Sequence, residues 1–427
     1  MQFNKSTNII PALAYRWEIK SNSKEYKFFI RQNVNFHNGE YLNSSIIQRS
    51  FERILDKSLY QNIAKISTSS DSTIIFSLYT PEPAFLSKLA MPMASIVLTD
   101  TNKNVYGTGP WKLNEWINDG HIILHRNDIY YNRKANYERL IIRIINDPFP
   151  RVASFKTGYI DILEIPDSEK KIWEYNSDFD SMIKNVDQLN TYYIGLNCER
   201  PPFNNKRVRQ ALNYAIDIDK IIKHLKGGYA TKAIGPIPPE LQKIKNREKY
   251  LYNPQIAKSL LEEAGYLNGF SVELWQTQDP EILNISEIIQ SELKKIGIDI
   301  TIVTRDWNSL SSAVRGGVPD MFYRSWYADY PDAENFLIPL FESEISQKKW
   351  TRYSNKKLDI ILNLISRESN NAKRDSLIFK AHQIVINDAP WIFLWHEKNS
   401  YITQPWIKNW EPAVMFNAEK YIRIKRD

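Results

Sequence analysis

The feature that most constrains the fold is a regular alternation of helix-like and strand-like segments in the second half of the chain. One helical pattern has Pro254 in its first turn and stops at Gly265, and another spans about 282–295 and stops at Gly297. The strand-like run 298–303 follows directly. Because helices that alternate with strands bury their apolar faces on a shared sheet, this part of the chain is predicted to form an α/β domain.

A longer helix is predicted upstream of this region, after the pair of prolines at 201 and 202. Apolar residues recur at helical spacing, and an asparagine stands at the expected cap. The pattern favours one amphipathic helix. Its apolar positions are Val208, Ala211, Leu212, Ala215 and Ile222.

The first part of the chain is predicted to hold a small α+β subdomain. Residues 15–20 and 26–31 have the composition of two strands joined by a polar turn, which predicts a hairpin. Ser44 and Ser45 are expected to cap a helix, and a further strand is expected at 72–78. Helix and strand signals that follow one another so closely are typical of an α+β arrangement.

Composition indicates a globular chain with a core ample enough for more than one domain. At 427 residues and 43% hydrophobic content, two lobes are expected. The net charge of +7 is spread in short pairs such as Lys356 and Lys357, which argues against a nucleic-acid-binding surface. No apolar stretch approaches the length of a membrane span. Aromatic residues reach 13%, which suggests a ligand site with flat walls.

The residue types needed for catalysis or metal binding are sparse. Cys198 is the single cysteine, so an internal disulfide is excluded and a small core residue is expected. Among the histidines only His121 and His125 lie close together, on one face of an expected strand, so neither a metal site nor a cofactor is predicted. Motifs for a serine nucleophile or a phosphate loop are absent, and although a scattered triad stays open, an enzyme is the least favoured class.

Residues 321–341 are the segment in which a ligand site is expected. Aromatic and acidic side chains crowd a pattern of strand, polar turn at Pro331, and helix. In α/β folds ligands bind beyond the carboxyl ends of strands, where Trp326 and Asp329 would lie, and a carboxylate beside aromatic walls suits a cation. The alternative is that Asp329 and Asp332 merely cap the following helix, and the segment alone leaves both interpretations open.

Motifs along nearly the whole chain then indicate a family. In their order and spacing they resemble the peptide and nickel group, family 5, of extracellular solute-binding proteins, which are the receptors of ABC importers. The RQALNYAID helix and the GTGP turn are the most specific. The motifs are PALAYRWEI, VNFHNGE, GTGPWKL, LHRNDIYY, FKTGYIDI, FNNKRVRQALNYAIDIDKII, YNPQIAKSLLEEAGY, ELKKIGIDI, WYADYPDAENFL and DAPWIFLWH.

The resemblance implies an α/β fold of the two-lobed, type II periplasmic-binding-protein kind, in which the lobes close on a ligand. The first lobe of such proteins carries an inserted α+β subdomain. Because the chain would cross between the lobes twice, the connection is expected to act as a hinge. On this sequence lobe I would comprise residues 1–188 and 408–427, the inserted subdomain about 25–100, and lobe II 189–407.

The resemblance also implies roles for individual residues in a peptide receptor. Asp329 matches the aspartate that binds the α-ammonium group of the ligand in peptide-binding members. Trp326 and Trp307 fall where oligopeptide-binding members place pocket-lining tryptophans, although Trp307 fits a packing role equally well. The position near Gln276, where dipeptide receptors carry an arginine for the ligand carboxylate, has none.

A nickel-chelate receptor, or a receptor for another small solute, is the first alternative within the same family. In the nickel branch an arginine and an aromatic pair touch the ligand, and the matching residues are Arg126, Trp326 and Tyr330. That branch does not keep the acid found at Asp329. The favoured interpretation is therefore a receptor that captures peptides in a cleft between two lobes and delivers them to a membrane permease, as a monomer without contact to nucleic acid.

The compartment depends on which interpretation holds. Residues 1–8 show no signal-peptide pattern, so the sequence is expected to be mature, truncated or cytoplasmic. Members normally carry a signal peptide, a lipid-bearing cysteine in many Gram-positive forms (the lipoproteins), and a further N-terminal segment ahead of the PALA motif. A receptor is expected in the periplasm or on the outer face of the membrane. The remaining alternative is a truncated receptor or the cytoplasmic ligand-sensing domain of a transcriptional regulator.

Overall fold

The computed structural model divides into two compact units. Unit 1 comprises Met1–Val186 and Asn399–Asp427, and unit 2 comprises Asp187–Lys398. The sequence-based division placed the two boundaries at 188/189 and 407/408. In the structure the second change of unit falls inside one continuous strand, β19 (Trp391–Thr403). The residues that the structure describes are 1–20, 23–174, 182–244, 249–415 and 421–426.

Unit 2 is built on a mixed sheet with the strand order β19, β14, β18, β16, β17. Strand β16 runs parallel to β17 and β18, whereas β14 is antiparallel to β18 and β19. Nearly every residue of β14 is buried, as expected for a strand covered on both faces. The strands are β14 (Asn190–Leu196), β16 (Phe270–Thr277), β17 (Ile298–Arg305), β18 (Met321–Tyr327), the first part of β19, and β15 (Ala230–Lys232), which also pairs with β19.

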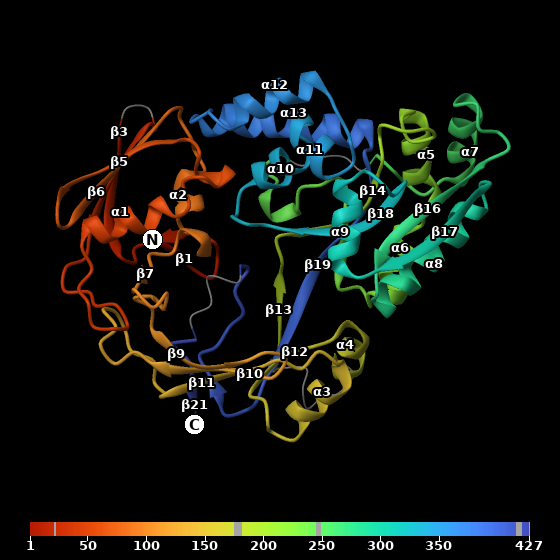
Figure 1. Ribbon diagram of the computed structural model, residues 1–427. Helices are drawn as coiled ribbons and strands as arrows, with labels where there is room; N and C mark the ends of the chain where they lie inside the picture. Colours follow the sequence, from red (N-terminus) through yellow and green to blue (C-terminus); the bar gives the residue numbers. More distant parts are fainter. Residues whose placement is uncertain (21–22, 175–181, 245–248, 416–420, 427) are drawn as a thin grey trace. The chain divides into compact units, whose positions relative to one another are not determined.

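Helices cover this sheet. Apolar residues of α5 to α8 join those of the central strands in one core cluster, and α12 and α13 lie along each other (Figure 1). The amphipathic patterns thus place their apolar faces on the sheet. The helices are α5 (Lys206–Ala215), α6 (Ile218–Leu225), α7 (Pro254–Glu263), α8 (Pro280–Lys294), α9 (Trp307–Arg315), α10 (Ile338–Phe341), α11 (Ser343–Lys349), α12 (Lys356–Ile365) and α13 (Asn371–Asp388), with 3-10 turns at Pro239–Leu241 and Ala333–Phe336.

The predicted alternation of helix and strand is confirmed for α7, α8 and β17. Gly265 and Gly297 follow the two helices with φ of +86° and +87°, the left-handed conformation that ends a helix at little cost in glycine. The single helix predicted over Val208 to Ile222 is wrong. Ile216 is extended, and the Asp217 side chain accepts a hydrogen bond from the Lys220 backbone at 3.0 Å, so that a new helix, α6, begins there.

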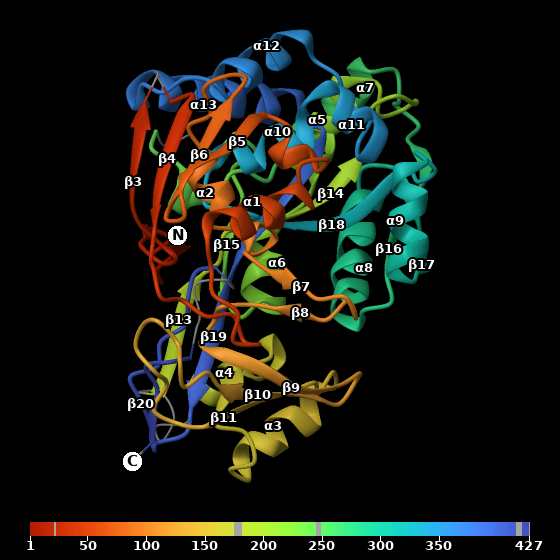
Figure 2. The ribbon, with the colours of Figure 1, turned by 60° about the vertical axis from the view of Figure 1, so that its left-hand side comes forward.

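One part of unit 1 is a four-stranded antiparallel sheet in the order β3, β4, β6, β5, with α1 packed on it (Figure 2). The predicted hairpin is confirmed as the pair β3 and β4. The helix cap is Asn43, one residue before the predicted serines, and it accepts a hydrogen bond from Ile46 at 2.9 Å. The elements are β3 (Ala14–Lys20), β4 (Glu25–Ile30), α1 (Ser44–Glu52), β5 (Ile63–Ser70), β6 (Thr73–Leu78) and α2 (Phe85–Leu89).

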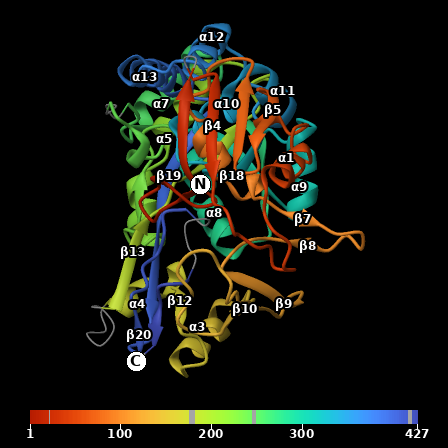
Figure 3. The same cartoon turned by 90° about the vertical axis from the view of Figure 1, so that its left-hand side faces the viewer.

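The rest of unit 1 contains a three-stranded sheet in the order β11, β10, β9, and the strands β12 and β13, which both pair with β19 (Figure 3). No helix in the described part of the chain is long and apolar enough to cross a membrane. The main elements are β9 (Trp111–Ile117), β10 (His121–Arg126), β11 (Arg139–Arg143), α3 (Pro148–Lys156), β12 (Ile162–Glu164), α4 (Asp167–Glu174) and β13 (Ile183–Asp187).

Short elements complete unit 1. They are the two-residue strands β1 (Gln2–Phe3), β2 (Ile9–Ile10), β7 (Leu98–Thr99), β8 (Val105–Tyr106), β20 (Ile407–Lys408) and β21 (Lys425–Arg426), and 3-10 turns at Ser58–Tyr60 and Pro92–Ala94.

Candidate ligand-binding site

Three of the predicted site residues lie at one edge of the unit 2 sheet. Because β16, β17 and β18 are parallel, their carboxyl ends meet at the same edge, where α/β folds bind ligands. Trp307 follows β17, Trp326 is the last residue but one of β18, and Asp329 lies in the loop after β18. The topology thus gathers side chains that are separated by some twenty residues in the sequence.

Asn335 holds Asp329 and Trp326 in place. Its Oδ1 accepts hydrogen bonds from the Asp329 backbone N–H at 3.0 Å and from the Trp326 indole Nε1 at 3.3 Å. Its Nδ2 donates to Asp329 Oδ2 at 3.3 Å. Asn335 is only 1% exposed, so the amide is fixed by the fold. The sequence reasoning missed this residue, because nothing in its local pattern distinguishes it from an ordinary loop asparagine.

Asp329 carries a carboxylate for which the described residues supply no cation. The side chain reaches solvent, and none of the salt bridges of the described chain involves it. The surrounding protein removes part of its hydration and raises the pKa of the carboxyl above its usual value, while the hydrogen bond from Asn335 acts in the opposite direction. Such a carboxylate can gain a charged partner from outside the protein.

The helix-cap interpretation is right for Asp332 and wrong for Asp329. Asp332 precedes the 3-10 turn Ala333–Phe336 and accepts a hydrogen bond from the Glu334 backbone at 2.9 Å. Its carboxylate also receives two hydrogen bonds from Arg374, at 2.9 and 3.0 Å. Asp329 takes no part in the cap, so its carboxylate needs another explanation.

A network centred on Arg374 fixes the loop around Asp329. Arg374 also donates to Glu334 at 2.8 Å, and the Tyr330 hydroxyl donates to the same glutamate at 3.0 Å. Burial opposes the charge on Arg374, but the carboxylates of Asp332 and Glu334 outweigh it and raise the pKa of the guanidinium. Tyr330 is 3% exposed, so the structure places this predicted contact residue inside the loop.

Trp307 covers a buried arginine. The Arg324 guanidinium lies 4.0 Å from the centre of the Trp307 ring and donates to Ser311 Oγ at 2.8 Å, while its Nε and Nη1 have no hydrogen-bond partner among the described residues. Burial lowers the pKa of Arg324. Trp307 itself is 62% exposed, so one face packs on the arginine while the ring remains accessible.

The other predicted positions have their own partners. Arg126 belongs to unit 1, where its Nε donates to Asp128 at 2.8 Å and its Nη1 to the Ala135 carbonyl at 3.4 Å. Gln276 is fully buried and accepts a hydrogen bond from Ser286.

Metal-ligating side chains are not clustered in the described residues, and the single cysteine has the environment of a packing residue. Within them no cluster of three or more histidine, cysteine, aspartate or glutamate side chains could hold a metal ion. Burial raises the pKa of the Cys198 thiol to about 11, and its Sγ donates to the Leu196 carbonyl at 3.4 Å. This cysteine is therefore a protonated packing residue at neutral pH.

Comparison with known proteins decides the family. The family model described as "Bacterial extracellular solute-binding proteins, family 5 Middle" matches residues 8–348. The chain belongs to this family. Heme-binding protein A of Haemophilus influenzae is 30% identical in sequence to this chain, over an alignment that covers 96% of this chain and 83% of that protein. The dipeptide-binding protein of Escherichia coli K12 is 28% identical to this chain, over an alignment that covers 92% of this chain and 81% of that protein.

Solved structures confirm the predicted fold. The periplasmic binding protein DppA from Helicobacter pylori, in complex with the peptide STSA, matches with a TM-score of 0.88 and 29% identity over 100% of this chain and 91% of that one. NikA from Brucella suis matches with a TM-score of 0.89 over 100% of this chain and 93% of that one. Because the sequence identity is only 21%, this match is evidence for the fold alone. This family 5 member therefore has the type II periplasmic-binding-protein fold. The heme-binding, dipeptide-binding and DppA relatives are binding proteins.

Proposed function

We propose that this solute-binding protein is the peptide receptor of an ABC importer, and that Asp329 binds the α-ammonium group of the peptide. The observation that carries the proposal is the Asp329 carboxylate itself, fixed by Asn335, accessible to solvent and without a cation among the described residues. Its partners would be a peptide and a membrane permease. It would act as a monomer on the outer side of the cytoplasmic membrane.

The chemistry of this carboxylate matches a free peptide. Charge-assisted hydrogen bonds are among the stronger polar contacts, and a carboxylate that has already lost part of its hydration gains more from an ammonium partner. Free peptides carry such a group. The relatives named for dipeptides and the DppA complex with STSA support this ligand class.

The experiment compares one peptide with its N-acetylated form. A peptide-library pull-down with mass spectrometry would identify a ligand, which is then titrated against the wild type and Asp329→Asn. Replacing the carboxylate by an amide should cost about 2–5 kcal/mol of binding free energy, or about 30-fold or more in affinity. Acetylation removes the ammonium, so it should weaken the wild type strongly and the variant little.

Asp299→Asn is the matched control. Asp299 is an exposed carboxylate at the start of β17, the opposite end of that strand from Trp307, and the same chemical change there should leave affinity unaltered. Equal losses on acetylation in the wild type and in Asp329→Asn would move the ammonium site elsewhere. Failure to retain any peptide would remove the peptide-receptor assignment.

A further inference from the structure

Helix α12 has one side that the core of unit 2 does not use. Its buried residues are Leu358, Leu362 and Ile365. On the other side, Ile360 is 64% exposed and Leu364 is 50% exposed. Figure 1 shows α12 along the outer side of α13, away from the strands of the unit 2 sheet. Two large aliphatic side chains, one helical turn apart, therefore lie in solvent.

Cations flank this aliphatic pair along the same side of the helix. Lys356 and Lys357 lie four and three residues before Ile360, and Arg367 lies three residues after Leu364. Arg367 is in the closing turn, where its backbone N–H donates to the Leu364 carbonyl at 3.2 Å. Because residues three and four apart share one side of a helix, these side chains form one exposed stripe. We call this stripe of five residues the α12 face.

The three cations of the α12 face have no acidic partner in the described part of the chain. None of them forms a salt bridge there. The acids nearest in sequence are held by neutral donors. The Asp359 carboxylate accepts hydrogen bonds from the backbone and hydroxyl of Ser343 at 3.0 and 2.7 Å, and Glu368 accepts one from the Asn370 backbone at 2.8 Å. The positive charge of the α12 face is therefore directed to solvent.

Helix stability does not explain the two lysines. Lys356 and Lys357 open α12 directly after its N-cap, Asn355. The N-terminal end of a helix carries a partial positive charge, so cations are unfavourable there. Exposed Lys373 repeats the arrangement in the first turn of α13. Local choices that act against the stability of a fold are typical of functional surfaces, so these lysines indicate a role in binding.

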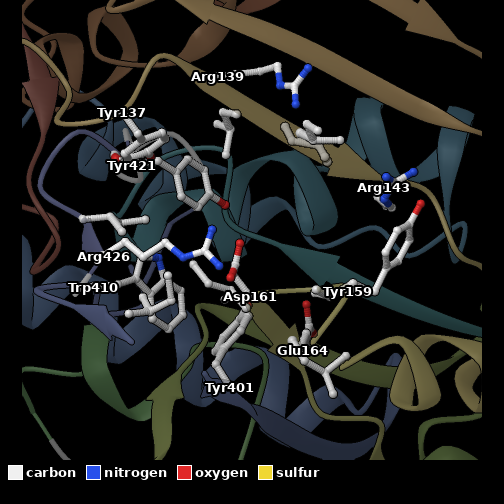
Figure 4. Close-up of a pocket in the computed structure, with 18 of the residues that line it drawn as sticks. Tyr137, Arg139, Arg143, Tyr159, Asp161, Glu164, Tyr401, Trp410, Tyr421 and Arg426 are labelled. Carbon is white, nitrogen blue, oxygen red and sulfur yellow. Dashed lines mark hydrogen bonds between the residues drawn. The ribbon is translucent and has the colours of Figure 1, made fainter. Parts of the chain in front are cut away.

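Other cations of the chain are used within the fold. At the cavity of about 810 Å³ in unit 1, the Arg143 guanidinium lies 4.1 Å from the centre of the Tyr159 ring (Figure 4). Arg426, which also lines this cavity, lies 5.5 Å from the centre of the Trp406 ring. Such contacts engage a cation with its own protein. Among the described residues, no ring contact of this kind involves the cations of the α12 face.

The composition of the α12 face matches the surface of an anionic membrane. Helices that lie in a membrane interface combine aliphatic side chains, which enter the headgroup region, with flanking lysine and arginine, which contact anionic headgroups. A nucleic acid offers phosphates but no environment for a central aliphatic pair. A stable protein partner buries about 800 Å² on each side, and two aliphatic side chains on one helix are a small anchor for such an interface.

We propose that the α12 face docks this protein on a membrane surface that contains anionic lipids. Ile360 and Leu364 enter the headgroup region, and the three cations contact lipid phosphates. With so few groups the contact is weak and reversible. It goes beyond the peptide-receptor function and does not depend on it, because no side chain of the α12 face contacts Asp329 or Asn335.

The test uses the chain of residues 1–427 without peptide. Unilamellar vesicles consist either of phosphatidylcholine alone or of phosphatidylcholine and phosphatidylglycerol in equal parts, and flotation measures the bound fraction. We expect binding to the mixed vesicles and little to phosphatidylcholine alone. Binding should be largely lost at about 1 M salt, where the Debye length falls to about 3 Å from about 10 Å at 0.1 M. Equal binding to both kinds of vesicle would contradict recognition of anionic lipid.

A triple variant tests the cations. Lys356→Gln, Lys357→Gln and Arg367→Gln together remove three charges and keep residues with good helix propensity. Each lysine or arginine close to an anionic surface strengthens binding about 5-fold, so the triple variant should bind the mixed vesicles about 100-fold more weakly. Binding equal to that of the wild type would overturn the proposal.

The matched control removes the same charge from other helices of unit 2. Lys220→Gln, Lys223→Gln and Lys258→Gln together replace three exposed lysines of α6 and α7. This control should bind the mixed vesicles nearly as well as the wild type does. If both triple variants lose the same affinity, the vesicles respond only to net charge, and docking through the α12 face is wrong.

A double variant tests the aliphatic pair. Ile360→Gln with Leu364→Gln keeps the charge of the α12 face and should weaken vesicle binding about 10-fold, since less apolar surface enters the headgroup region. The matched control, Ile256→Gln with Leu267→Gln, changes exposed aliphatic residues elsewhere in unit 2 and should have no effect. Unchanged binding of the first variant would overturn lipid docking and favour an acidic protein as the partner.

The outcomes separate this proposal from the peptide-receptor function. Peptide affinity is measured in parallel, and the two α12-face variants should bind peptide as the wild type does. All the substituted side chains are exposed, so far-ultraviolet circular dichroism should be unchanged. A wild type that does not bind the mixed vesicles would overturn the docking and leave the receptor assignment intact. A wild type that binds vesicles but retains no peptide would contradict the receptor assignment alone.

Discussion

At the scale of single residues, Asn335 is the side chain on which the geometry of the site depends. Asn335→Ala removes the acceptor for the Asp329 backbone and for the Trp326 indole, and it leaves a small void. Because buried polar groups that lose their partners are costly, we expect the free energy of unfolding to fall by about 1–3 kcal/mol. Urea denaturation measures this change.

Asn308→Ala is the matched control for that substitution. Asn308 is exposed on α9, so the same change in chemistry should alter stability by no more than about 0.5 kcal/mol. If both variants lose the same stability, the Asn335 hydrogen bonds contribute nothing measurable and the description of the site as rigid is wrong.

The raised pKa of Asp329 predicts opposite pH trends for ligand binding and for stability. Ammonium binding needs the ionised carboxylate, so affinity should fall as pH decreases through the raised pKa, and this loss should begin at a higher pH than for an ordinary aspartate. The empty folded protein binds more protons than the unfolded chain in that window. Its stability should therefore fall slightly as pH rises through the window.

Asp329→Asn should abolish both trends. Titration calorimetry and thermal unfolding of the two proteins between acidic and neutral pH provide the measurements. An affinity that is independent of pH in the wild type would show that Asp329 stays ionised or does not contact the ligand.

Contacts between residues that are close in the chain could be predicted from the sequence, whereas contacts between distant residues could not. Trp326 and Asp329 share one motif, and the structure does join them. Arg374 lies 42 positions after Asp332, and its role depends on the packing of α13, which no local pattern encodes. The assignment of Arg324 as the cation beneath Trp307 required knowledge of strand order.

At the scale of elements, Arg374 connects α13 to the loop that carries Asp329. Arg374→Ala would leave the carboxylates of Asp332 and Glu334, whose side chains are 17% and 2% exposed, without their cation. Removing one partner of a buried ion pair is strongly destabilising, so we expect a loss of about 3–5 kcal/mol in unfolding free energy. Chemical denaturation checks it.

Lys373→Ala provides the comparison on the same helix. Lys373 is exposed and adjacent in sequence to Arg374, so its truncation should be nearly neutral. A loss for Arg374→Ala below about 1 kcal/mol, a value typical of surface pairs, would mean that solvent screens this network despite its burial.

Element prediction worked best where a periodic pattern ended at a glycine and worst at polar interruptions. Residues 391–395 and 400–402 have the composition of two strands separated by the polar and charged residues 396–399, whereas the structure has the single strand β19. Its central charged residues are satisfied by ion pairs, since Glu397 contacts Lys226 at 2.6 Å and Lys398 contacts Asp187 at 3.1 Å. Tertiary partners thus allow a strand to continue through residues that would otherwise end it.

At the scale of the whole molecule, the composition predicts weak affinity for free transition-metal ions. Histidines are few, and the described residues contain no cluster that could serve as a ligand set. We expect purified protein to bind Ni²⁺ or Zn²⁺ no better than a generic protein surface does. A stoichiometric submicromolar site in isothermal titration would contradict this and favour a nickel-related ligand.

The fold class of the whole chain was predictable because motifs recur in register along most of it, and the family comparison confirms that reading. The position within β19 at which the chain passes from unit 2 to unit 1 could not be predicted from the sequence. A strand that runs from one unit into the other has no composition shift or linker at the change, so the sequence offers no signal there.

The last prediction concerns the independence of unit 2. Residues 187–398 are contiguous and contain a core cluster drawn from α5 to α8 and the central strands, whereas unit 1 is assembled from two separate segments. A segment with its own core is expected to fold alone. The isolated fragment should therefore unfold cooperatively in urea with native-like circular dichroism.

Asn335→Ala should destabilise this fragment about as much as it destabilises the full chain, because all the partners of Asn335 lie in unit 2. That comparison distinguishes a native fragment from a collapsed one. The cut after Lys398 interrupts β19, so the corresponding fragment of residues 187–403, which keeps that strand whole, serves as the control. If neither fragment unfolds cooperatively, the core of unit 2 depends on unit 1 for its stability, and the division into two units does not describe folding.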